Sequence, residues 1–276
     1  MIVIAGPCVI EDEVLVNEIA DELKRQLGGL PVEFFFKASF DKANRTSIHG
    51  FRGPGLKNGL KILSDIKQRT GFRVLTDFHT VEQAEPVAEV ADCIQVPAFL
   101  CRQTDMIVAA AEAAIKHGRK LNVKKGQFLA PWDVKNIIEK VSAVQTASQK
   151  PARPIGEWLY ITERGSSFGY NSLVVDMTSF QTIQAYGVPV IFDATHSVQM
   201  PGAGPGGKST GGRREYIEPL AKAAIAAGAD GIFMECHPRP EEAKSDGPNA
   251  FYLQHVGGFV RQLQSISELI HKQEEI

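Results

Sequence analysis

The chain has 276 residues, of which 43% are hydrophobic, and its formal net charge is −2 at pH 7. This length suits one or two globular domains with a large core, and barrels of about 250 residues are commonly single domains. The near-neutral charge argues against nucleic-acid binding, and no apolar stretch approaches the roughly 20 residues that span a bilayer.

The chain opens directly on a strand pattern. Residues Met1–Pro7 contain no basic segment of the kind that begins a signal peptide, so we expect a cytoplasmic protein. Further short apolar runs, rich in Val, Ile, Leu and Phe, indicate strands that are buried on both faces. The predicted strands are Ile2–Ala5, Glu33–Lys37, Arg73–Thr76, Cys93–Val96, Leu121–Lys124, Leu159–Thr162, Val188–Phe192 and Gly231–Met234.

Amphipathic stretches lie between these runs and predict helices. They are Glu11–Leu27, Leu56–Thr70, Val81–Val90, Thr104–His117, Pro131–Val144, Leu173–Tyr186, Arg213–Ala227 and Phe259–His271. Thr80 is a predicted N-cap, and glycines such as Gly71 and Gly118 fall where helices should end. Strands and helices in strict alternation predict a (β/α)8 TIM barrel that forms a single domain over residues 1–276. A doubly wound open sheet is the alternative, but the regularity of the units favours closure.

Two connections break the regular pattern. Gln145–Glu157 is polar and contains two prolines, so it predicts a surface loop. Met200–Gly212 is rich in Gly and Pro and follows the seventh predicted strand. It is a candidate lid over the catalytic side of the barrel, with a disordered loop as the alternative.

The stretch Lys37–Ser47 follows the second predicted strand and contains two lysines, an arginine, an asparagine and several hydroxyls. Such a set suits a phosphate, because it supplies charge together with several N–H and O–H donors. For this stretch alone, a solvated charged loop is an equally good interpretation.

Polar residues follow every predicted strand, and a barrel carries its active site at these carboxyl ends. In strand order they are Cys8; Lys37 and Lys42–Thr46; Asp77 and His79; Gln95, Arg102 and Gln103; Lys124 and Lys125; Glu163 and Arg164; Asp193 and His196; and Glu235, His237 and Asp246. Packing alone does not explain this convergence, because unpaired buried charge is costly. The sequence therefore predicts a catalytic site.

The cations among these residues predict anionic substrates, because so many positive charges in one cavity attract phosphates or carboxylates. They are Lys37, Lys42, Arg45, Lys124 and Arg164.

A second group offers ligands for a divalent first-row metal. Its members are Cys8, His196, Glu235 and Asp246. Only the barrel would bring them together, so their spacing gives no support, and for Cys8 alone the alternative is a small buried hydrophobe, which is the commoner role of a cysteine. Cys236 and His237 are rival ligands, but strand alternation points Cys236 to the face opposite Glu235.

Long motifs occur in order over essentially the whole chain. They are Gly6–Cys8, Lys37–Ser47, Gln95–Asp105, Asn122–Phe128, Thr162–Gly165, Phe168–Tyr170, Asp193–Ser197 and Ser245–Gly247. Together they resemble the 3-deoxy-D-manno-octulosonate 8-phosphate synthase family. The resemblance implies a homotetrameric barrel enzyme that condenses phosphoenolpyruvate with D-arabinose 5-phosphate, releases inorganic phosphate and serves the synthesis of the Kdo sugar of lipopolysaccharide.

The resemblance also assigns roles to residues. It implies that phosphoenolpyruvate is bound by Lys37, Lys42, Gln95, Lys124 and Arg164, and that arabinose 5-phosphate is bound by Asn44, Arg45 and Thr46. It implies catalytic roles for Lys42, Asn44, His196 and Asp246. Members with Cys at the position of Cys8 are metal-dependent, whereas members with Asn there are not. This chain therefore resembles the metal-dependent class, with Zn²⁺, Fe²⁺ or Mn²⁺ held by Cys8, His196, Glu235 and Asp246.

Two rival functions remain, because a third interpretation, a purely structural barrel, leaves the charged rim unexplained. The nearest is the related synthase that uses erythrose 4-phosphate in the aromatic pathway, which usually has Lys-Pro-Arg-Thr where this chain has Lys42-Ala43-Asn44-Arg45. Asn44 and the extra residue favour the longer sugar. The other rival is a barrel that binds phosphosugars without catalysis; loss of a metal ligand or a phosphate cation would favour it, and none is missing.

Overall fold

Eight parallel strands form a closed barrel in the computed structural model, which describes residues 1–45, 47–200 and 211–274. The barrel strands are β1 (Ile2–Gly6), β2 (Glu33–Lys37), β3 (Arg73–Asp77), β4 (Cys93–Val96), β5 (Lys120–Lys124), β6 (Leu159–Glu163), β9 (Val190–Asp193) and β12 (Gly231–His237). Parallel pairing of β1 with β12 closes the ring. The predicted TIM barrel is confirmed, and the strand predictions are correct to within two residues, except that β12 continues to His237.

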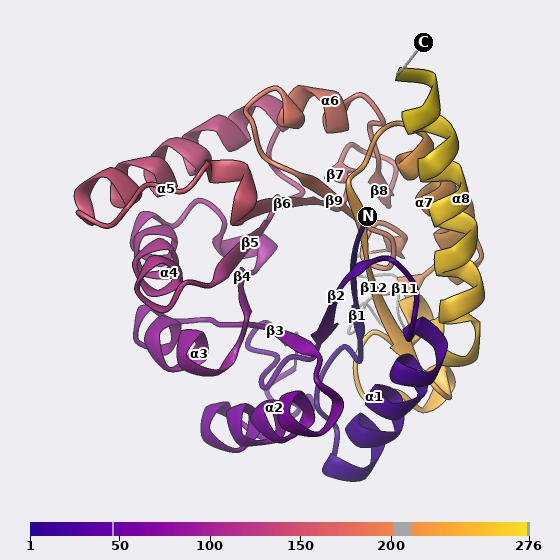
Figure 1. The fold of residues 1–276 in the computed structure, drawn as a ribbon. Helices are drawn as coiled ribbons and strands as arrows, with labels where there is room; N and C mark the ends of the chain where they lie inside the picture. Colours follow the sequence, from indigo (N-terminus) through magenta and orange to yellow (C-terminus); the bar gives the residue numbers. More distant parts are fainter. Residues whose placement is uncertain (46, 201–210, 275–276) are drawn as a thin grey trace.

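Helices surround the strands, as Figure 1 shows. They are α1 (Glu13–Leu27), α2 (Leu56–Thr70), α3 (Ala84–Val90), α4 (Thr104–His117), α5 (Lys135–Ala147), α6 (Ser179–Gln184), α7 (Ile217–Ala226) and α8 (Val256–Glu274). The stretches predicted to begin at Val81, Pro131 and Arg213 start with single 3-10 turns before α3, α5 and α7. Gly71 and Gly118 end α2 and α4 in the left-handed conformation, as predicted.

Large apolar side chains fill the inside of the barrel. Ile2, Ile4, Phe35, Leu75, Cys93, Tyr160, Ile191 and Phe233 form a separate buried cluster there. A second, larger cluster packs the outer faces of the strands against the helices. Because side chains fill the interior, it is a packed core and not a pore, and the active sites of such barrels lie at the carboxyl ends of the strands.

The sixth predicted helix is wrong over its first part. Leu173–Val174 forms a short strand, β8, which pairs in antiparallel fashion with β7 (Ser166–Ser167). The side chain of Asp176 then accepts a hydrogen bond from the backbone N–H of Thr178, and α6 begins only at Ser179. Leu173 and Val174 are apolar because they pack in this hairpin, and not because they begin an amphipathic helix.

The two irregular connections also differ from the expectation. The predicted loop Gln145–Glu157 is shorter, because α5 continues to Ala147 and residues Ile155–Glu157 form a 3-10 turn. In the candidate lid, β10 (Gln199–Met200) pairs with β11 (Gly211–Gly212). Residues 201–210 lie outside the described part of the chain, so the lid stays a prediction.

The remaining named strand, β13 (Phe251–Tyr252), pairs with the end of β12. Among the described residues, no helix is both long enough and apolar enough to cross a membrane.

Candidate active site

Charged side chains line the carboxyl ends of the barrel strands, and most are buried. Those with less than a tenth of their surface exposed include Lys37, Asp77, Lys124, Arg164, Asp193 and Glu235. A buried charge is tolerated only when it is paired and hydrogen-bonded. The partners of each charge therefore define what the site can bind.

Lys37 connects the ends of three strands. Its Nζ lies 2.6 Å from Glu235 Oε1 and donates to the backbone carbonyls of Pro7, at 3.3 Å, and Cys8, at 2.8 Å. Gly6 makes this close packing possible, because a Cβ there would lie 2.0 Å from the carbonyl oxygen of Lys37. Burial raises the pKa of Glu235, but Lys37, His196 and Lys42 outweigh it and hold that pKa well below its usual range. Glu235 is therefore a carboxylate with a fixed orientation.

Three of the four predicted metal ligands come together. One ligand atom from each of Cys8, Glu235 and Asp246 lies within 4.8 Å of the other two. Cys8 Sγ is 3.0 Å from Ser245 Oγ and 3.2 Å from Asp246 Oδ2. Asp246 adopts a left-handed backbone with φ of 51°, an uncommon conformation that recurs at functional sites.

The fourth predicted ligand, His196, lies beside this group. Its Nδ1 is 2.7 Å from Asp193 Oδ2, and its Nε2 is 3.7 Å from Glu235 Oε2. A carboxylate at that distance requires a proton on Nδ1, which leaves the Nε2 lone pair facing Glu235 when the ring is neutral. A carboxylate that fixes the tautomer in this way is a common partner of metal-binding histidines.

These residues fit a divalent metal ion. The carboxylates of Glu235 and Asp246 converge with the Cys8 sulfur, and His196 Nε2 lies 3.7 Å from Glu235; a cation between the two carboxylates would remove their mutual repulsion. Burial, followed by Glu235, raises the pKa of the Cys8 thiol well above its usual range, so without a cation Cys8 is a thiol. A metal would make it a thiolate, as metal binding generally does.

The rival ligands face elsewhere. Cys236 belongs to the core between the barrel and the helices, as strand alternation predicts. His237 Nε2 is 3.7 Å from Glu11 Oε1, and its Nδ1 accepts the backbone N–H of Arg239. The geometry therefore favours Glu235 as the ligand from β12.

Lys124 and Arg164 extend from the ends of β5 and β6. Lys124 Nζ lies 2.6 Å from Asp193 Oδ2 and 3.6 Å from the centre of the Phe233 ring. Arg164 donates to two side-chain amides, at 2.9 Å to Gln127 Oε1 and at 2.7 Å to Gln199 Oε1. Burial lowers the pKa of both cations, and nearby carboxylates oppose that effect. Because neutral amides hold Arg164, its charge is available for an anion.

Gln199 joins the two halves of the site. Its Oε1 accepts from Arg164, and its Nε2 donates to Asp246 Oδ1 at 3.3 Å. The sequence did not single out Gln199 or Gln127 as functional residues. Both are neutral, and no charge or metal-ligand pattern marks them.

A chain of polar side chains crosses the floor of the site. Asn122 Nδ2 donates to Gln95 Oε1 at 2.9 Å, and Thr162 Oγ1 donates to Asn122 Oδ1 at 2.7 Å. Sequence reasoning named Gln95 but missed the other two. Strand alternation would have found them, because Asn122 and Thr162 lie two residues before Lys124 and Arg164.

Lys42 lies at the edge of the metal-ligand group. Its Nζ is 3.7 Å from Glu235 Oε1 and 3.1 Å from Ser39 Oγ. Ser39 donates to Asp77 at 2.5 Å, and Asp77 also accepts from His79 Nε2 at 3.0 Å. Burial is the largest cause acting on Lys42 and lowers its pKa, but Cys8 when ionised, and the carboxylates of Glu235, Asp77 and Asp246, outweigh it, so the pKa is raised. Lys42 is therefore a fixed cation.

The sugar-phosphate residues predicted by resemblance lie in the loop after β2. Arg45 donates to the backbone carbonyls of Phe51, at 2.7 Å, and Lys244, at 3.1 Å, which orient the guanidinium without neutralising it. Asn44 is exposed in the same loop. Thr46 lies outside the described residues.

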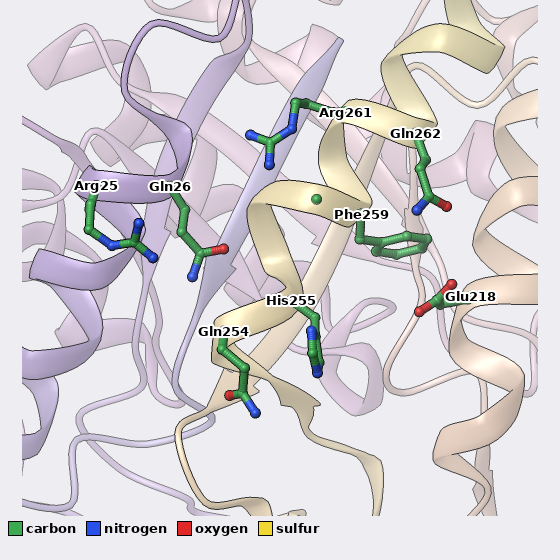
Figure 2. Close-up of a pocket in the computed structure, with 9 residues that line it drawn as sticks. Arg25, Gln26, Glu218, Gln254, His255, Phe259, Arg261 and Gln262 are labelled. Carbon is green, nitrogen blue, oxygen red and sulfur yellow. The ribbon is translucent and has the colours of Figure 1, made fainter.

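Other hollows lie away from the barrel mouth. One of about 380 Å³ is formed by α1, α7 and α8, and Figure 2 shows the side chains around it. Arg25 there pairs with Glu22, while Gln26 bonds the carbonyl of Leu253 and the N–H of Gly257. Arg25 and Gln26 therefore already have partners within the protein.

Comparisons with known proteins show the family of the chain. A model of the DAHP synthetase I family matches residues 1–272. A protein of Geobacter sp. (strain M21) named 2-dehydro-3-deoxyphosphooctonate aldolase is 52% identical over 269 residues, or 98% of this chain and 93% of that protein. Proteins of the same name and coverage from Geotalea uraniireducens and Nitratidesulfovibrio vulgaris are 52% and 51% identical. The chain therefore belongs to the DAHP synthetase I family.

Proposed function

We propose that this chain condenses phosphoenolpyruvate with D-arabinose 5-phosphate to give 3-deoxy-D-manno-octulosonate 8-phosphate and inorganic phosphate, in the synthesis of Kdo for lipopolysaccharide. One observation carries this proposal: relatives that are 52% identical across 98% of the chain bear the name 2-dehydro-3-deoxyphosphooctonate aldolase. The barrel mouth supports it, because cations occur in two places, one on β5 and β6 and one in the loop after β2.

Phosphoenolpyruvate is assigned to the deep part of the mouth. Lys124 and Arg164 supply buried positive charge, and buried cations attract anions more strongly than exposed ones do. Arg164 has a planar guanidinium that can donate to a phosphate or a carboxylate in a bidentate manner. Lys37 and Gln95 lie on neighbouring strands and complete this subsite, with Lys42 at its edge.

Arabinose 5-phosphate is assigned to the loop after β2. Arg45 is the phosphate group's main partner, because backbone carbonyls aim it and leave its charge unneutralised. Asn44 and Thr46 would contact the sugar hydroxyls and the phosphate. Lys42 lies between the two subsites, close to Glu235 and the metal-ligand group.

We also propose that the enzyme binds Zn²⁺, Fe²⁺ or Mn²⁺ through Cys8, His196, Glu235 and Asp246. The mixture of thiol, imidazole and carboxylate suits these ions better than Mg²⁺. When bound, the ion supplies a Lewis acid at the barrel mouth. Lys37 and Asp193 hold Glu235 and His196 in place for it.

The protein's own residues contribute positioning and charge. Holding an enol phosphate against an aldehyde in the right geometry supplies several kcal/mol of the barrier. Lys37, Lys42, Lys124 and Arg164 offset the repulsion between the anionic groups of two substrates in one cavity.

Phosphate release from phosphoenolpyruvate tests the function. The assay uses a panel of aldose phosphates, with and without EDTA. We expect kcat/KM to be far higher with arabinose 5-phosphate than with erythrose 4-phosphate. Equal or reversed values would assign the chain to the aromatic pathway, and no release with any aldose would favour a non-catalytic phosphosugar-binding protein.

We further propose that the chain forms a homotetramer. Large exposed aromatic side chains on the loops after β4, β5 and β6 support contact between copies; they are Phe99, Phe128, Trp132, Phe168 and Tyr170. Phe168 and Tyr170 are 77% and 71% exposed, and exposed aromatic patches commonly mark protein interfaces. Light scattering on the purified protein measures the number of subunits directly.

We place the enzyme in the cytoplasm. Its four cysteines are unpaired and buried, which suits a reducing compartment. Cell fractionation with an antibody against the chain tests this proposal, and recovery in a periplasmic fraction would contradict it.

A further inference from the structure

A buried ion pair lies behind the phosphoenolpyruvate subsite, on the outer side of the barrel wall. Lys125 Nζ is 3.4 Å from Glu163 Oε2, and the two side chains are 0% and 2% exposed. Lys125 follows Lys124, and Glu163 precedes Arg164, so strand alternation directs each charged neighbour to the opposite face. The pair therefore does not reach the mouth, and the proposed reaction makes no direct use of it.

Lys125 ties together the loops after β5 and β6. Its Nζ donates to the backbone carbonyls of Leu129, at 2.9 Å, and Gly126, at 3.3 Å, and to Ser166 Oγ at 3.2 Å. Glu163 Oε1 accepts the backbone N–H of Gly165 at 2.5 Å. Within the described chain, Glu163 Oε2 has no hydrogen-bond partner, so the charge of Lys125 is its main compensation.

The two tied loops hold Arg164. Gln127 lies between Gly126 and Leu129, both of which Lys125 holds, and its Oε1 accepts from Arg164 Nη1. The backbone carbonyl of Gln127 accepts the N–H of Ser167, in the loop where Glu163 binds the N–H of Gly165 and Lys125 binds Ser166. Any shift of one loop relative to the other therefore moves the amide that orients the guanidinium.

We propose that Lys125 and Glu163 are positioning residues that set the placement of Arg164 relative to Lys124, and through it the affinity for phosphoenolpyruvate. This inference rests on the proposed function, because that function assigns the two cations to phosphoenolpyruvate. A buried charge pair is not needed for stability alone, since apolar residues of similar volume are often as stable. The pair instead fixes the loops after β5 and β6 relative to each other, through several hydrogen bonds.

Three variants separate positioning from stability. Lys125→Met removes the ammonium and leaves a buried carboxylate, so the melting temperature should fall. Glu163→Gln keeps an oxygen for the Gly165 N–H while removing the charge. The double variant has no uncompensated charge, so it should recover most of the melting temperature. It still lacks every bond from Lys125 to the two loops.

Calorimetric titration with phosphoenolpyruvate is the deciding measurement. We expect the double variant to bind it about tenfold or more weakly than the wild type, because displacements of about 1 Å can cost about a hundredfold in function. KM for arabinose 5-phosphate should change by less than about twofold, since its residues are on another loop. Ser166→Ala, a mild change on a half-exposed hairpin, removes one hydrogen bond to Lys125 and should weaken phosphoenolpyruvate binding by about two- to tenfold.

Lys67→Met is the matched control. Lys67 pairs with Asp92 at 2.6 Å near the opposite ends of the strands. Loss of this pair should lower the melting temperature without changing the affinity for either substrate. If phosphoenolpyruvate affinity returns to the wild-type value in the double variant together with the melting temperature, the pair is only structural and the inference is wrong. A wild-type protein that binds phosphoenolpyruvate but releases no phosphate would instead overturn the proposed function.

Discussion

Lys37→Met is the most direct test of the electrostatics of the site. It removes the ammonium that lies 2.6 Å from Glu235 Oε1, while a methionine keeps much of the side-chain volume. The two side chains are 1% and 2% exposed, so water cannot screen the carboxylate that is left. Breaking a buried ion pair in this way costs about 3–5 kcal/mol.

Lys42 reduces that cost, because its Nζ remains 3.7 Å from the same oxygen. We therefore expect a loss of about 3 kcal/mol, at the lower end of the range. For a chain of this length, 1 kcal/mol corresponds to about 2 °C, so the melting temperature should fall by about 6 °C. Thermal and urea unfolding in the presence of a chelator measure both quantities.

Two controls accompany this variant. Lys37→Met/Glu235→Gln carries neither charge and should recover most of the lost stability. Lys135→Met breaks an exposed pair with Glu139 and should change stability by less than about 1 kcal/mol. Zn²⁺ should stabilise the Lys37→Met protein, because a cation at Glu235 replaces the missing charge. A Lys37→Met protein within about 0.5 kcal/mol of the wild type in chelator would refute the reasoning.

Further predictions concern the sugar subsite, the metal and the assembly. Arg45→Ala should raise KM for arabinose 5-phosphate by about ten- to a hundredfold, since a charged hydrogen bond contributes about 1.5–3 kcal/mol. Steady-state kinetics should show KM for phosphoenolpyruvate almost unchanged; a larger effect on that substrate would mean that the two cationic subsites are exchanged. Cys8→Ala should lose bound metal, measured by atomic emission, together with activity, whereas Cys8→Asn should keep some activity that EDTA does not remove. Wild-type protein that stays fully active after exhaustive chelation would leave Cys8 as a buried structural residue. Phe168→Glu/Tyr170→Glu should shift the mass measured by light scattering from tetramer toward smaller species, and an unchanged mass would place the interface elsewhere.

The barrel and its charged mouth were predictable from the sequence because they depend on local patterns. Apolar runs of four or five residues alternate with amphipathic stretches, and polar residues follow each run. Alternation along β12 was enough to prefer Glu235 to Cys236, and the structure puts these two side chains on opposite faces. The gathering of Cys8, Glu235 and Asp246 then follows from closure of the ring.

Features that depend on contacts between loops were not predictable in the same way. Leu173–Val174 is too short a run to identify as a strand, and only its pairing with Ser166–Ser167 makes it one. Gln199 is a neutral residue outside any helix or strand predicted from the sequence, and its role appears only when Arg164 and Asp246 lie on either side of it. Strand alternation places Asn122 and Thr162 on the same face as Lys124 and Arg164. Both residues are uncharged, so a search for charged side chains does not find them.

The bridging amide of Gln199 has a consequence for how this site can change during evolution. A side-chain amide has an acceptor oxygen and a donor NH2 group. In Gln199 the oxygen accepts from the cation Arg164, and the NH2 group donates to the anion Asp246. Glutamate at this position would attract Arg164 but repel Asp246, and lysine would do the reverse. The phosphate-binding side and the metal-binding side are therefore not free to exchange their charges independently. A lineage that reversed the charge at one side would have to replace the bridge as well.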